Sequence, residues 1–392
     1  MALYLGYFGA VFDMEMATIS EAVEIPVILG ERGRMRVFVD ALRHCRYDIT
    51  SCAERLGVFP RLGVNFWSTF RPARKPRHHD RVDTLLDLFV DGNPVPVEQI
   101  RTLFSSAFVD SAVEMRLAEK NGRFLESKVS LFPCYGKYIV TDRAAKNTSI
   151  NQVMWLWGES FLLGGLVNRT HQRRRAIDLG TGSGVHAILA SDHCREVVAV
   201  DINPRAIEFA KFNCALNGVF NVELVLSDLL NSVDGTCDLL VANPPYAPDS
   251  AARAGDNFWS GGLDGCDLLR RIIELLPSRL DVEGVCHINA LYPNPPGTTI
   301  KEHFDLWLGG SVGCYEVLDH TWPVPRYEDI FSEKPFTGDK SAWRFGVVSL
   351  RRTRSNDGWW KEVAGKGLIF SKDGRCSVIA DHDAVYPMAI TN

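Results

Sequence analysis

The tetrapeptide Asn-Pro-Pro-Tyr at 243–246 combines residue types that can hold one planar nitrogen atom. Pro244 and Pro245 restrict the backbone and lack amide donors, so the carbonyl oxygens of the loop remain available. The side-chain oxygen of Asn243 and the carbonyl oxygen of Pro244 can each accept a hydrogen bond from a substrate N–H. Tyr246 can lie flat on a conjugated group. Two such acceptors would aim the nitrogen lone pair at an electrophile, which predicts group transfer onto an amide, guanidine or exocyclic amine.

A second pattern, AIDLGTGSG at 176–184, predicts a strand that runs into a glycine turn. Gly180, Gly182 and Gly184 let the backbone turn sharply and approach a ligand without clashes from Cβ atoms. Asp178, at the end of the strand, can accept from an ammonium group of that ligand. The G-x-G-x-G spacing differs from the G-x-G-x-x-G of dinucleotide sites, which argues against NAD.

Two further acids follow predicted strands. Asp201 ends VVAVD, where an acid can bind both ribose hydroxyls of an adenosine, and Asp228 closes VELVLSD, where it could accept from the adenine amino group. As isolated residues, Asp178 and Asp228 could be loop or capping acids, but their common register favours ligand contact. The predicted cofactor-binding set is Asp178, Gly180, Thr181, Gly182, Gly184, Asp201, Ile202, Asp228, Leu229 and Asn243.

Strands and helices must alternate to position these residues. From 176 onward the patterns predict strands at AIDL, VVAVD, VELVLSD, CDLLVANPP and EGVCHINALYP, with helices from 185, over 204–217 and over 264–280. Apolar runs at 312–318 and 343–350 could complete the sheet. This rhythm is typical of a parallel α/β sheet that binds ligands at the carboxyl ends of its strands. A second Asn-Pro-Pro, at 294–296, lacks the tyrosine and is interpreted as a loop.

The chain is divided into residues 1–143, 144–352 and a partly β tail at 353–392. Helical patterns at 33–57, 82–90, 97–104 and 110–119 precede an alternating hairpin around 133–136, which suggests a mainly helical, winged-helix-like N-terminal domain. Its third helix would carry Asp110, Glu114 and Glu119. That charge favours a domain that caps the cleft over one that reads DNA.

Composition limits the alternatives. The 392 residues carry a net charge of −5 and 46% hydrophobic residues, which is typical of a soluble globular protein without a general basic field. HQRRR at 171–175 is a local basic segment, interpreted as a solvated loop. The ten cysteines form no C-x-x-C pair, so we expect neither a metal site nor disulfides. The opening apolar stretch is too short to span a bilayer and lacks signal-peptide features.

Together, these motifs resemble class I S-adenosylmethionine-dependent methyltransferases of the NPPY group, over about residues 176–352. The layout is similar to HemK-like proteins of the actinobacterial type. The resemblance implies a Rossmann-like seven-stranded sheet in the order 3-2-1-4-5-7-6, with an antiparallel seventh strand at 343–350. It also implies S-adenosylmethionine as cofactor, with Asp178 and the glycines at the methionine part, Asp201 at the ribose and Asp228 at the adenine. Thr148 and Glu159 lie where related enzymes cover the cofactor.

The function predicted is N-methylation of a small metabolite, a guanidine, amide or amine of a specialised biosynthetic pathway, in the cytoplasm. Protein glutamine or RNA-base methylation stays open, as does a non-catalytic winged-helix DNA-binding regulator. We expect a small-molecule partner and neither nucleic acid nor membrane; the sequence leaves the oligomeric state open. Candidates for enclosing the substrate and meeting a cation are Phe258, Trp259, Trp322, Tyr327, Asp256, Glu328 and Asp329.

Overall fold

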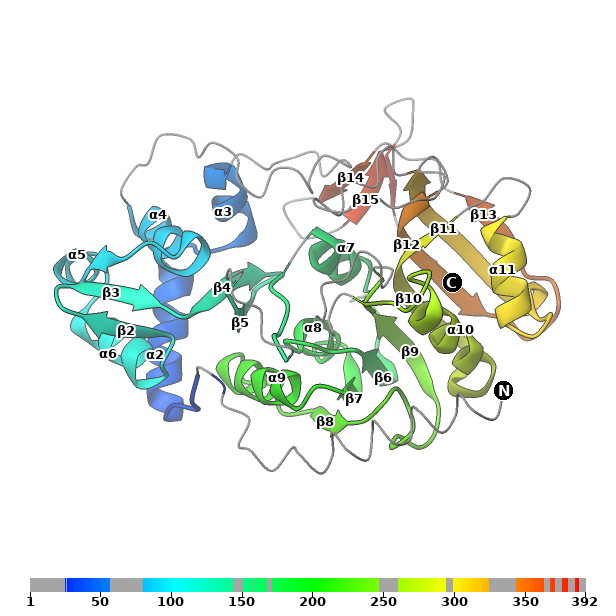
Figure 1. Cartoon of the computed structure of the whole chain (residues 1–392), viewed down its shortest axis with the longest axis horizontal. Helices are drawn as coiled ribbons and strands as arrows, with labels where there is room; N and C mark the ends of the chain where they lie inside the picture. Colours follow the sequence, from blue (N-terminus) through cyan, green and yellow to red (C-terminus); the bar gives the residue numbers. More distant parts are fainter. Residues whose placement is uncertain are drawn as a thin grey trace.

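A central sheet of eight strands lies beside a smaller N-terminal region in the computed structural model (Figure 1). The structure describes residues 25, 27–56, 80–143, 151–156, 158–167, 171–246, 260–293, 299–323, 343–362, 367–370, 376–379 and 385–387. The sheet and its helices comprise α7 (Gly158–Leu166), β6 (Arg173–Leu179), α8 (Val185–Ala190), β7 (Cys194–Asp201), α9 (Pro204–Leu216), β8 (Val222–Leu226), β9 (Cys237–Ala242), α10 (Asp267–Arg279), β10 (Leu280–Pro293), α11 (Ile300–Trp307), η3 (Val312–Cys314), β11 (Tyr315–Pro323), β12 (Trp343–Arg352) and β13 (Trp360–Glu362).

The strands lie in the order β8-β7-β6-β9-β10-β12-β11-β13. The first five run parallel, and β12 is antiparallel to both of its neighbours. With the strands numbered as in the sequence-based expectation, this is 3-2-1-4-5-7-6 with β13 added beside strand six. Residues 360–362 therefore join the sheet by pairing with β11, although the sequence analysis assigned them to a separate tail.

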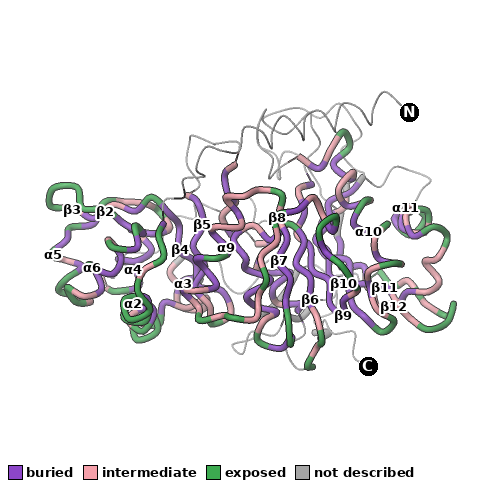
Figure 2. Tube along the Cα trace, turned by 90° about the horizontal axis from the view of Figure 1, so that it is seen from below, coloured by how far each residue is buried: buried purple, intermediate pink, exposed green. Residues whose placement is uncertain are grey.

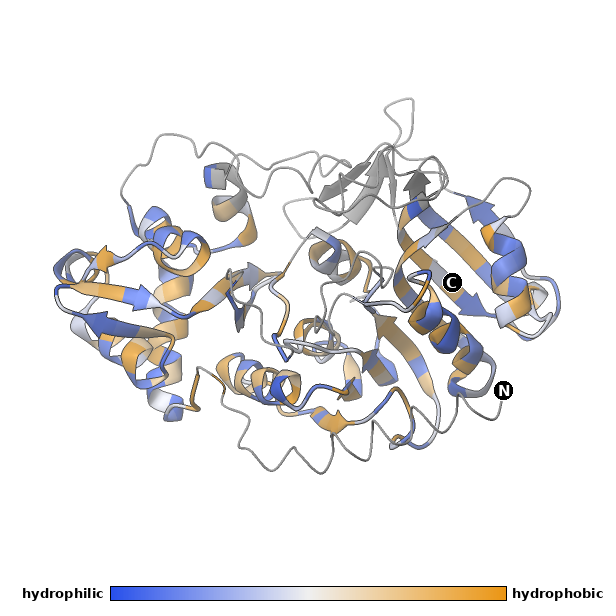
Figure 3. Ribbon diagram, in the orientation of Figure 1, coloured by the Kyte–Doolittle hydropathy of each residue, from blue (hydrophilic) through white to orange (hydrophobic). Residues whose placement is uncertain are grey.

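Alternation along the strands decides which helices cover which face. Ile177 and Leu179 pack in one cluster with residues of α10 and α11, whereas Ala176 packs with α7 and α8. Successive strand residues point to opposite faces, so Asp178 shares the α8 face with Ala176. Figure 2 shows the buried (purple) strands at the centre, and Figure 3 shows β9 mostly orange where the visible side of α10 is mostly blue. The apolar sides of both layers meet in the core.

The N-terminal region begins with helices and ends with two hairpins. Its elements are α2 (Arg32–His44), α3 (Ile49–Leu56), α4 (Arg81–Leu86), η2 (Asp87–Asp91), β1 (Val95–Pro96), α5 (Val97–Leu103), α6 (Ser106–Glu114), β2 (Ala118–Asn121), β3 (Phe124–Ser127), β4 (Val129–Cys134) and β5 (Lys137–Asp142). Strands β1, β3 and β2 form one small sheet, and β4 and β5 form another. Phe38 stacks on Phe108 with ring centroids 4.8 Å apart inside this core. The winged-helix-like designation stays a prediction.

Two helical expectations in this region are wrong in detail. The single pattern over 33–57 is two helices, because Arg46 adopts a left-handed φ of 58° and the chain turns there. Tyr47 is buried after that turn, and its hydroxyl donates to the carbonyl of Leu131 at 2.8 Å. The third helix ends at Glu114 instead of 119, because Arg116 has a φ of 56° and the next residues begin β2.

Asn213 of α9 and Asn217, the residue that follows this helix, join the N-terminal region to the sheet domain. Asn213 and Asn217 each accept from the backbone N–H and donate to the carbonyl of one β5 residue, Val140 and Tyr138 respectively, at 2.7–2.8 Å. Asn213 also donates to the carbonyl of Ser183 at 2.8 Å. These two side chains thus take the place of a neighbouring strand for β5, and one of them contacts the glycine turn.

The last strands, β14 (Gly367–Phe370), β15 (Cys376–Ile379) and β16 (Val385–Pro387), form a separate three-stranded sheet. Nine cysteines with described side chains are free thiols, and seven of them are buried. Of the helices that the structure describes, none has the length and apolar character needed to cross a membrane.

Candidate functional site

The glycine turn lies at the carboxyl end of β6 with open space beside it. Gly180, Gly182 and Gly184 have φ values of 66°, 54° and 82°, which side chains other than glycine rarely adopt. A Cβ atom added at Gly180 or Gly182 would meet no atom of the described residues within 4 Å, whereas one at Gly184 would lie 3.0 Å from the Cβ of Ala210. The first two glycines therefore leave room for a ligand, and the third allows close packing of α8 against α9.

Asp178 mainly holds the turn onto the following helix. Its Oδ2 atom accepts from the hydroxyl of Thr181 at 2.6 Å and from the backbone N–H of Ala187 at 2.9 Å. The side chain is buried, which raises its pKa. Its Oδ1 atom is buried without a partner among the described residues. Only this second oxygen is available for the ligand contact expected from the sequence.

Asp201 also binds the turn, from the end of the adjacent strand. Its two oxygens accept from the backbone N–H groups of Gly182, at 2.8 Å, and Asn203, at 2.9 Å. Burial is the main cause that raises the pKa of this carboxyl to about 6. The next residue, Ile202, leaves 55% of its surface exposed. An acid followed by an open apolar side chain therefore borders the space beside the glycines.

Asp228 lies near the same edge, since the N–H of Ser227 donates to the carbonyl of Asp201 at 2.9 Å. Its carboxylate, however, forms an ion pair with Arg271 of α10 at 2.7 Å. The adjacent Leu229 adopts a left-handed φ of 48°. The free acceptor that the sequence analysis expected at Asp228 is thus partly neutralised.

Strand pairing brings the Asn-Pro-Pro-Tyr loop beside the glycine turn. Leu179 is paired with Ala242, so the next residues of both strands leave the sheet side by side. Ala242 is also paired with Ile288, which places Asn243 next to Asn289 of β10. The Nδ2 atom of Asn289 donates to the Oδ1 atom of Asn243 at 2.9 Å. Sequence reasoning missed Asn289, although a polar residue in the apolar run VCHINALY was a signal for it.

The sequence analysis expected Tyr246 to face the substrate, but the structure shows that its side chain is buried. It is 6% exposed, and its ring meets Phe345 of β12 edge-on with the ring centroids 5.7 Å apart. Burial and the neighbouring Glu159 raise the pKa of its hydroxyl. Phe345 of β12, a strand of the sheet, and Glu159 of α7 thus lie against the tyrosine. Pro244 and Pro245 follow Asn243 in the same loop; Pro244 is buried and Pro245 is half-buried.

Glu159, in the first turn of α7, is a buried acid. It is 2% exposed, and its Oε2 atom has no partner among the described residues. Burial is the main cause that raises its pKa to about 8, although the neighbouring Tyr246 hydroxyl opposes this shift. The sequence analysis placed Glu159 near the cofactor; the structure places it against the tyrosine of the loop.

We expect Glu159→Gln to remove part of the pH dependence of stability. The folded state keeps the Glu159 proton up to about pH 8, whereas the unfolded chain loses it near 4.5. Its contribution is therefore complete below pH 4.5 and is lost as the pH rises through 8. Melting temperatures measured from pH 5 to pH 9 should fall less for the glutamine variant than for the wild type. Equal slopes would contradict the burial of an acid with this pKa.

The basic segment begins β6, at the end opposite the glycine turn, and is not a loop. The backbone N–H groups of Arg174 and Arg175 both donate to Asp238 at 2.8 Å. The Arg174 guanidinium pairs with Asp281 at 2.8 Å, and that of Arg175 with Glu196 at 2.9 Å. These acids neutralise the segment, so it supplies no basic surface at the candidate site.

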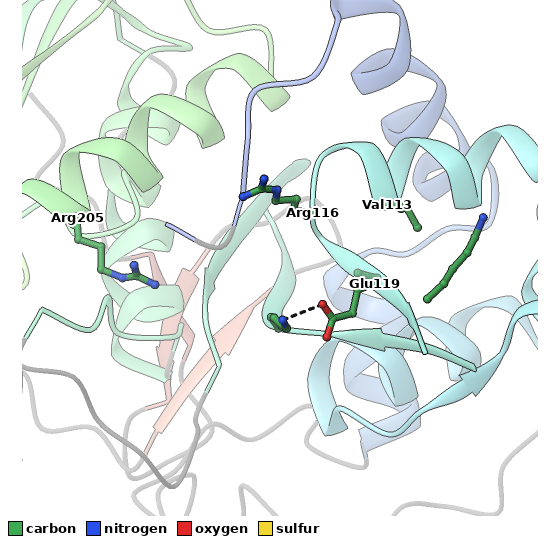
Figure 4. A pocket seen from close by; sticks show the side chains of 7 residues that line it. Val113, Arg116, Glu119 and Arg205 are labelled. Atoms are coloured by element: carbon green, nitrogen blue, oxygen red, sulfur yellow. Dashed lines mark ion pairs between the residues drawn. The ribbon is translucent and has the colours of Figure 1, made fainter. Parts of the chain in front are cut away.

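A cavity of about 390 Å³ lies elsewhere, between β2 and the start of α9 (Figure 4). Its lining residues are Val113, Arg116, Ala118, Glu119, Lys120, Lys128 and Arg205. Three of its basic side chains are paired with acids, in the pairs Lys128–Glu119 (2.7 Å), Lys120–Asp110 (3.7 Å) and Arg205–Asp142 (2.6 Å). None of the site residues expected from the sequence lines this cavity.

Within the described ranges, no group of three or more His, Cys, Asp or Glu side chains could hold a metal ion. Trp322 lies in β11, but its side chain is not described. Other expected site residues and the second Asn-Pro-Pro lie outside the described residues, namely Thr148, Asp256, Phe258, Trp259, Tyr327, Glu328, Asp329 and 294–296.

One segment of the chain matches a known protein family. Residues 157–260 match the family model of the methyltransferase small domain. The match confirms, for this segment, the methyltransferase expected from the sequence, and this family uses the expected donor, S-adenosylmethionine.

Three curated relatives resemble this segment. A protein of Methanocaldococcus jannaschii, provisionally named a protein N5-glutamine methyltransferase, is 37% identical over 122 residues, which are 30% of this chain and 61% of the relative. The release factor glutamine methyltransferase of Mycolicibacterium smegmatis is 33% identical, covering 29% and 44%. The ribosomal protein uL3 glutamine methyltransferase of Bradyrhizobium diazoefficiens is 35% identical, covering 32% and 44%. The chain thus matches between 44% and 61% of the length of these relatives.

The names of these relatives describe protein substrates. The expectation of a small-molecule partner is therefore wrong.

Among solved structures, the ribosomal protein L11 methylase of Lactobacillus delbrueckii is similar with a TM-score of 0.32 and 21% identity, over 50% of this chain and 78% of that one.

Proposed function

We propose that this chain transfers a methyl group from S-adenosylmethionine to the side-chain amide nitrogen of a glutamine in a protein. The observation that carries the proposal is the pairing of Leu179 with Ala242, which starts the Asn-Pro-Pro-Tyr loop beside the open glycine turn. A glutamine amide is a planar nitrogen with two N–H donors, which suits two acceptors in one loop. The names of the curated relatives support the same acceptor.

The residues around the glycine turn fit the donor. Gly180 and Gly182 leave the open space that a bound nucleoside and methionine need. The unpartnered Oδ1 atom of Asp178 can accept from the ammonium group, and Asp201 can accept from ribose hydroxyls. Ile202 can lie against the adenine ring. When bound, S-adenosylmethionine supplies an electrophilic methyl group.

The loop would orient the acceptor. Asn243 Oδ1 and the Pro244 carbonyl each accept from one N–H of the glutamine amide, so that the nitrogen lone pair faces the methyl carbon. The new C–N bond replaces the bond between methyl and sulfur, and the sulfur keeps that electron pair as the thioether of S-adenosylhomocysteine. The nitrogen releases one of its two protons to solvent water as the product leaves. Tyr246 closes the far end of the loop against Phe345 and Glu159, which excludes water from this side.

Labelling with a methyl-labelled donor tests the proposal. The full chain is incubated with labelled S-adenosylmethionine and a cell extract separated into protein, RNA and small-molecule fractions. We expect label in a protein, on a glutamine side chain located by mass spectrometry, and none after that glutamine is replaced by glutamate. Label confined to the RNA or small-molecule fraction would refute the glutamine assignment.

Donor affinity should depend on pH through Asp201, whose carboxyl has a pKa of about 6 before the ligand binds. Above that pH the carboxylate accepts from the ribose hydroxyls as an anion; below it the proton must leave first. We expect the affinity for S-adenosylhomocysteine, measured by calorimetry, to be constant above pH 7 and to fall below pH 6. Asp201→Asn should bind about tenfold or more weakly at pH 7.5, because hydrogen bonds to charged groups contribute about 1.5–3 kcal/mol. A variant with wild-type affinity and the same fall below pH 6 would contradict this role.

A further inference from the structure

Asn289 is a polar side chain in a place where the sheet calls for an apolar one. It lies on β10 between β9 and β12, opposite Val347, and is fully buried. Its neighbours along the strand include the buried Ile288, Ala290 and Leu291. A buried amide is costly unless its hydrogen bonds repay the loss of water. An aliphatic residue would fill this position without that cost.

The only hydrogen bond of the Asn289 side chain among the described residues is the one from its Nδ2 atom to Asn243 Oδ1, at 2.9 Å. Its own Oδ1 atom is buried without a partner in the same part of the chain. Among the described residues, this hydrogen bond is therefore the only one that offsets the cost of burying the Asn289 amide. Whatever Asn289 contributes passes through the side chain of Asn243.

The direction of this hydrogen bond matters for Asn243. The two ends of an asparagine amide have nearly the same shape, and one accepts while the other donates. If Asn243 turned over, its NH2 group would face the NH2 group of Asn289. A carbonyl oxygen has two lone pairs, so Asn243 Oδ1 can accept from Asn289 and still accept from a substrate N–H.

We propose that Asn289 is a positioning residue, which fixes the amide of Asn243 with its oxygen toward the acceptor nitrogen. This inference rests on the proposed function, because it assumes that Asn243 binds the acceptor. A donor from the neighbouring strand holds the orientation before the substrate arrives, so that no amide rotation is needed at the moment of transfer.

Two variants of the full chain test the proposal. Asn289→Ala removes the donor, and Asn289→Asp replaces it with an acceptor of nearly the same shape. We expect alanine to lower kcat about tenfold and aspartate to lower it further, with the KM for S-adenosylmethionine unchanged in both. Ser349→Ala is the matched control, since Ser349 is buried on the same side of the sheet and contacts His287 at 2.8 Å instead of Asn243. It should keep wild-type kcat.

A double-mutant cycle with Asn243→Ala shows whether Asn289 acts through Asn243. In that background, Asn289→Ala should change neither residual methyl transfer nor the urea midpoint by as much as it does in the wild type. Equal effects in both backgrounds would overturn the proposal, as would an aspartate variant as active as the wild type. The urea unfolding measurements need no substrate. If the wild type methylates no glutamine, the proposed function fails, and the coupling of the two asparagines is still decided by the urea midpoints.

Discussion

Asn243→Ala is expected to lower the turnover number by about 10²–10³-fold while donor affinity stays close to that of the wild type. The magnitude is that of losing one preorganised hydrogen-bonding group at a reacting centre. Asn243 begins the loop after β9, and its oxygen is held by Asn289 on the side away from the glycine turn. Its loss should therefore affect the acceptor and leave the donor site intact. Labelled methyl transfer and calorimetry with S-adenosylhomocysteine measure the two effects separately.

Asn231→Ala serves as the control for this experiment, because Asn231 is an exposed asparagine in the turn after β8. It should change neither quantity. If Asn243→Ala kept the wild-type turnover on the true acceptor, the loop would not be the acceptor site, and the proposed function would lose its main support.

Asn213→Leu is expected to be the most destabilising single change considered. Leucine is similar in size but leaves three backbone groups without their partner: the N–H and carbonyl of Val140 and the carbonyl of Ser183. Each buried polar group that loses its hydrogen bond costs about 1–3 kcal/mol. We expect a loss of about 3 kcal/mol or more in the free energy of unfolding, measured with urea. Donor affinity should also fall, because Ser183 belongs to the glycine turn.

Asn217→Leu provides the matched comparison four residues further, at the residue that follows α9. Asn217 makes the same two contacts with Tyr138, at 2.7 and 2.8 Å, but none with the glycine turn. It is half-buried, so water can reach some of the groups left behind. This variant should lose less stability and keep wild-type donor affinity. Equal effects of both variants on donor affinity would show that the link to Ser183 does not support the turn.

Local patterns were enough for the strand and helix order of the sheet domain. Apolar runs before Asp178 and Asp201, and the glycines between β6 and α8, are short-range signals, because buried strands and left-handed turns depend on neighbours in the chain. The same signals failed at 33–57 and 110–119. There, single left-handed residues, Arg46 and Arg116, end the helices, and both are arginines with no intrinsic preference for that conformation.

The prediction of a small molecule as the methyl acceptor was the larger error. Scattered aromatic and acidic residues after 250 suggested a small cation as substrate, but none of their side chains is described. The relatives act on proteins according to their names. Residue types in a loop say which groups can hold a planar nitrogen. They do not say what that nitrogen is attached to.

By itself, the sequence determined that a glycine turn and an Asn-Pro-Pro-Tyr loop follow strands of one α/β sheet, because both motifs are contiguous in the chain. Tertiary structure alone decided which distant side chains meet them. Asn289 of β10 donates a hydrogen bond to Asn243 at the end of β9, Glu159 of α7 lies against Tyr246 of the loop, and Arg271 of α10 forms an ion pair with Asp228. These contacts depend on strand register and helix packing, which join residues far apart in the chain and leave no periodic trace in it.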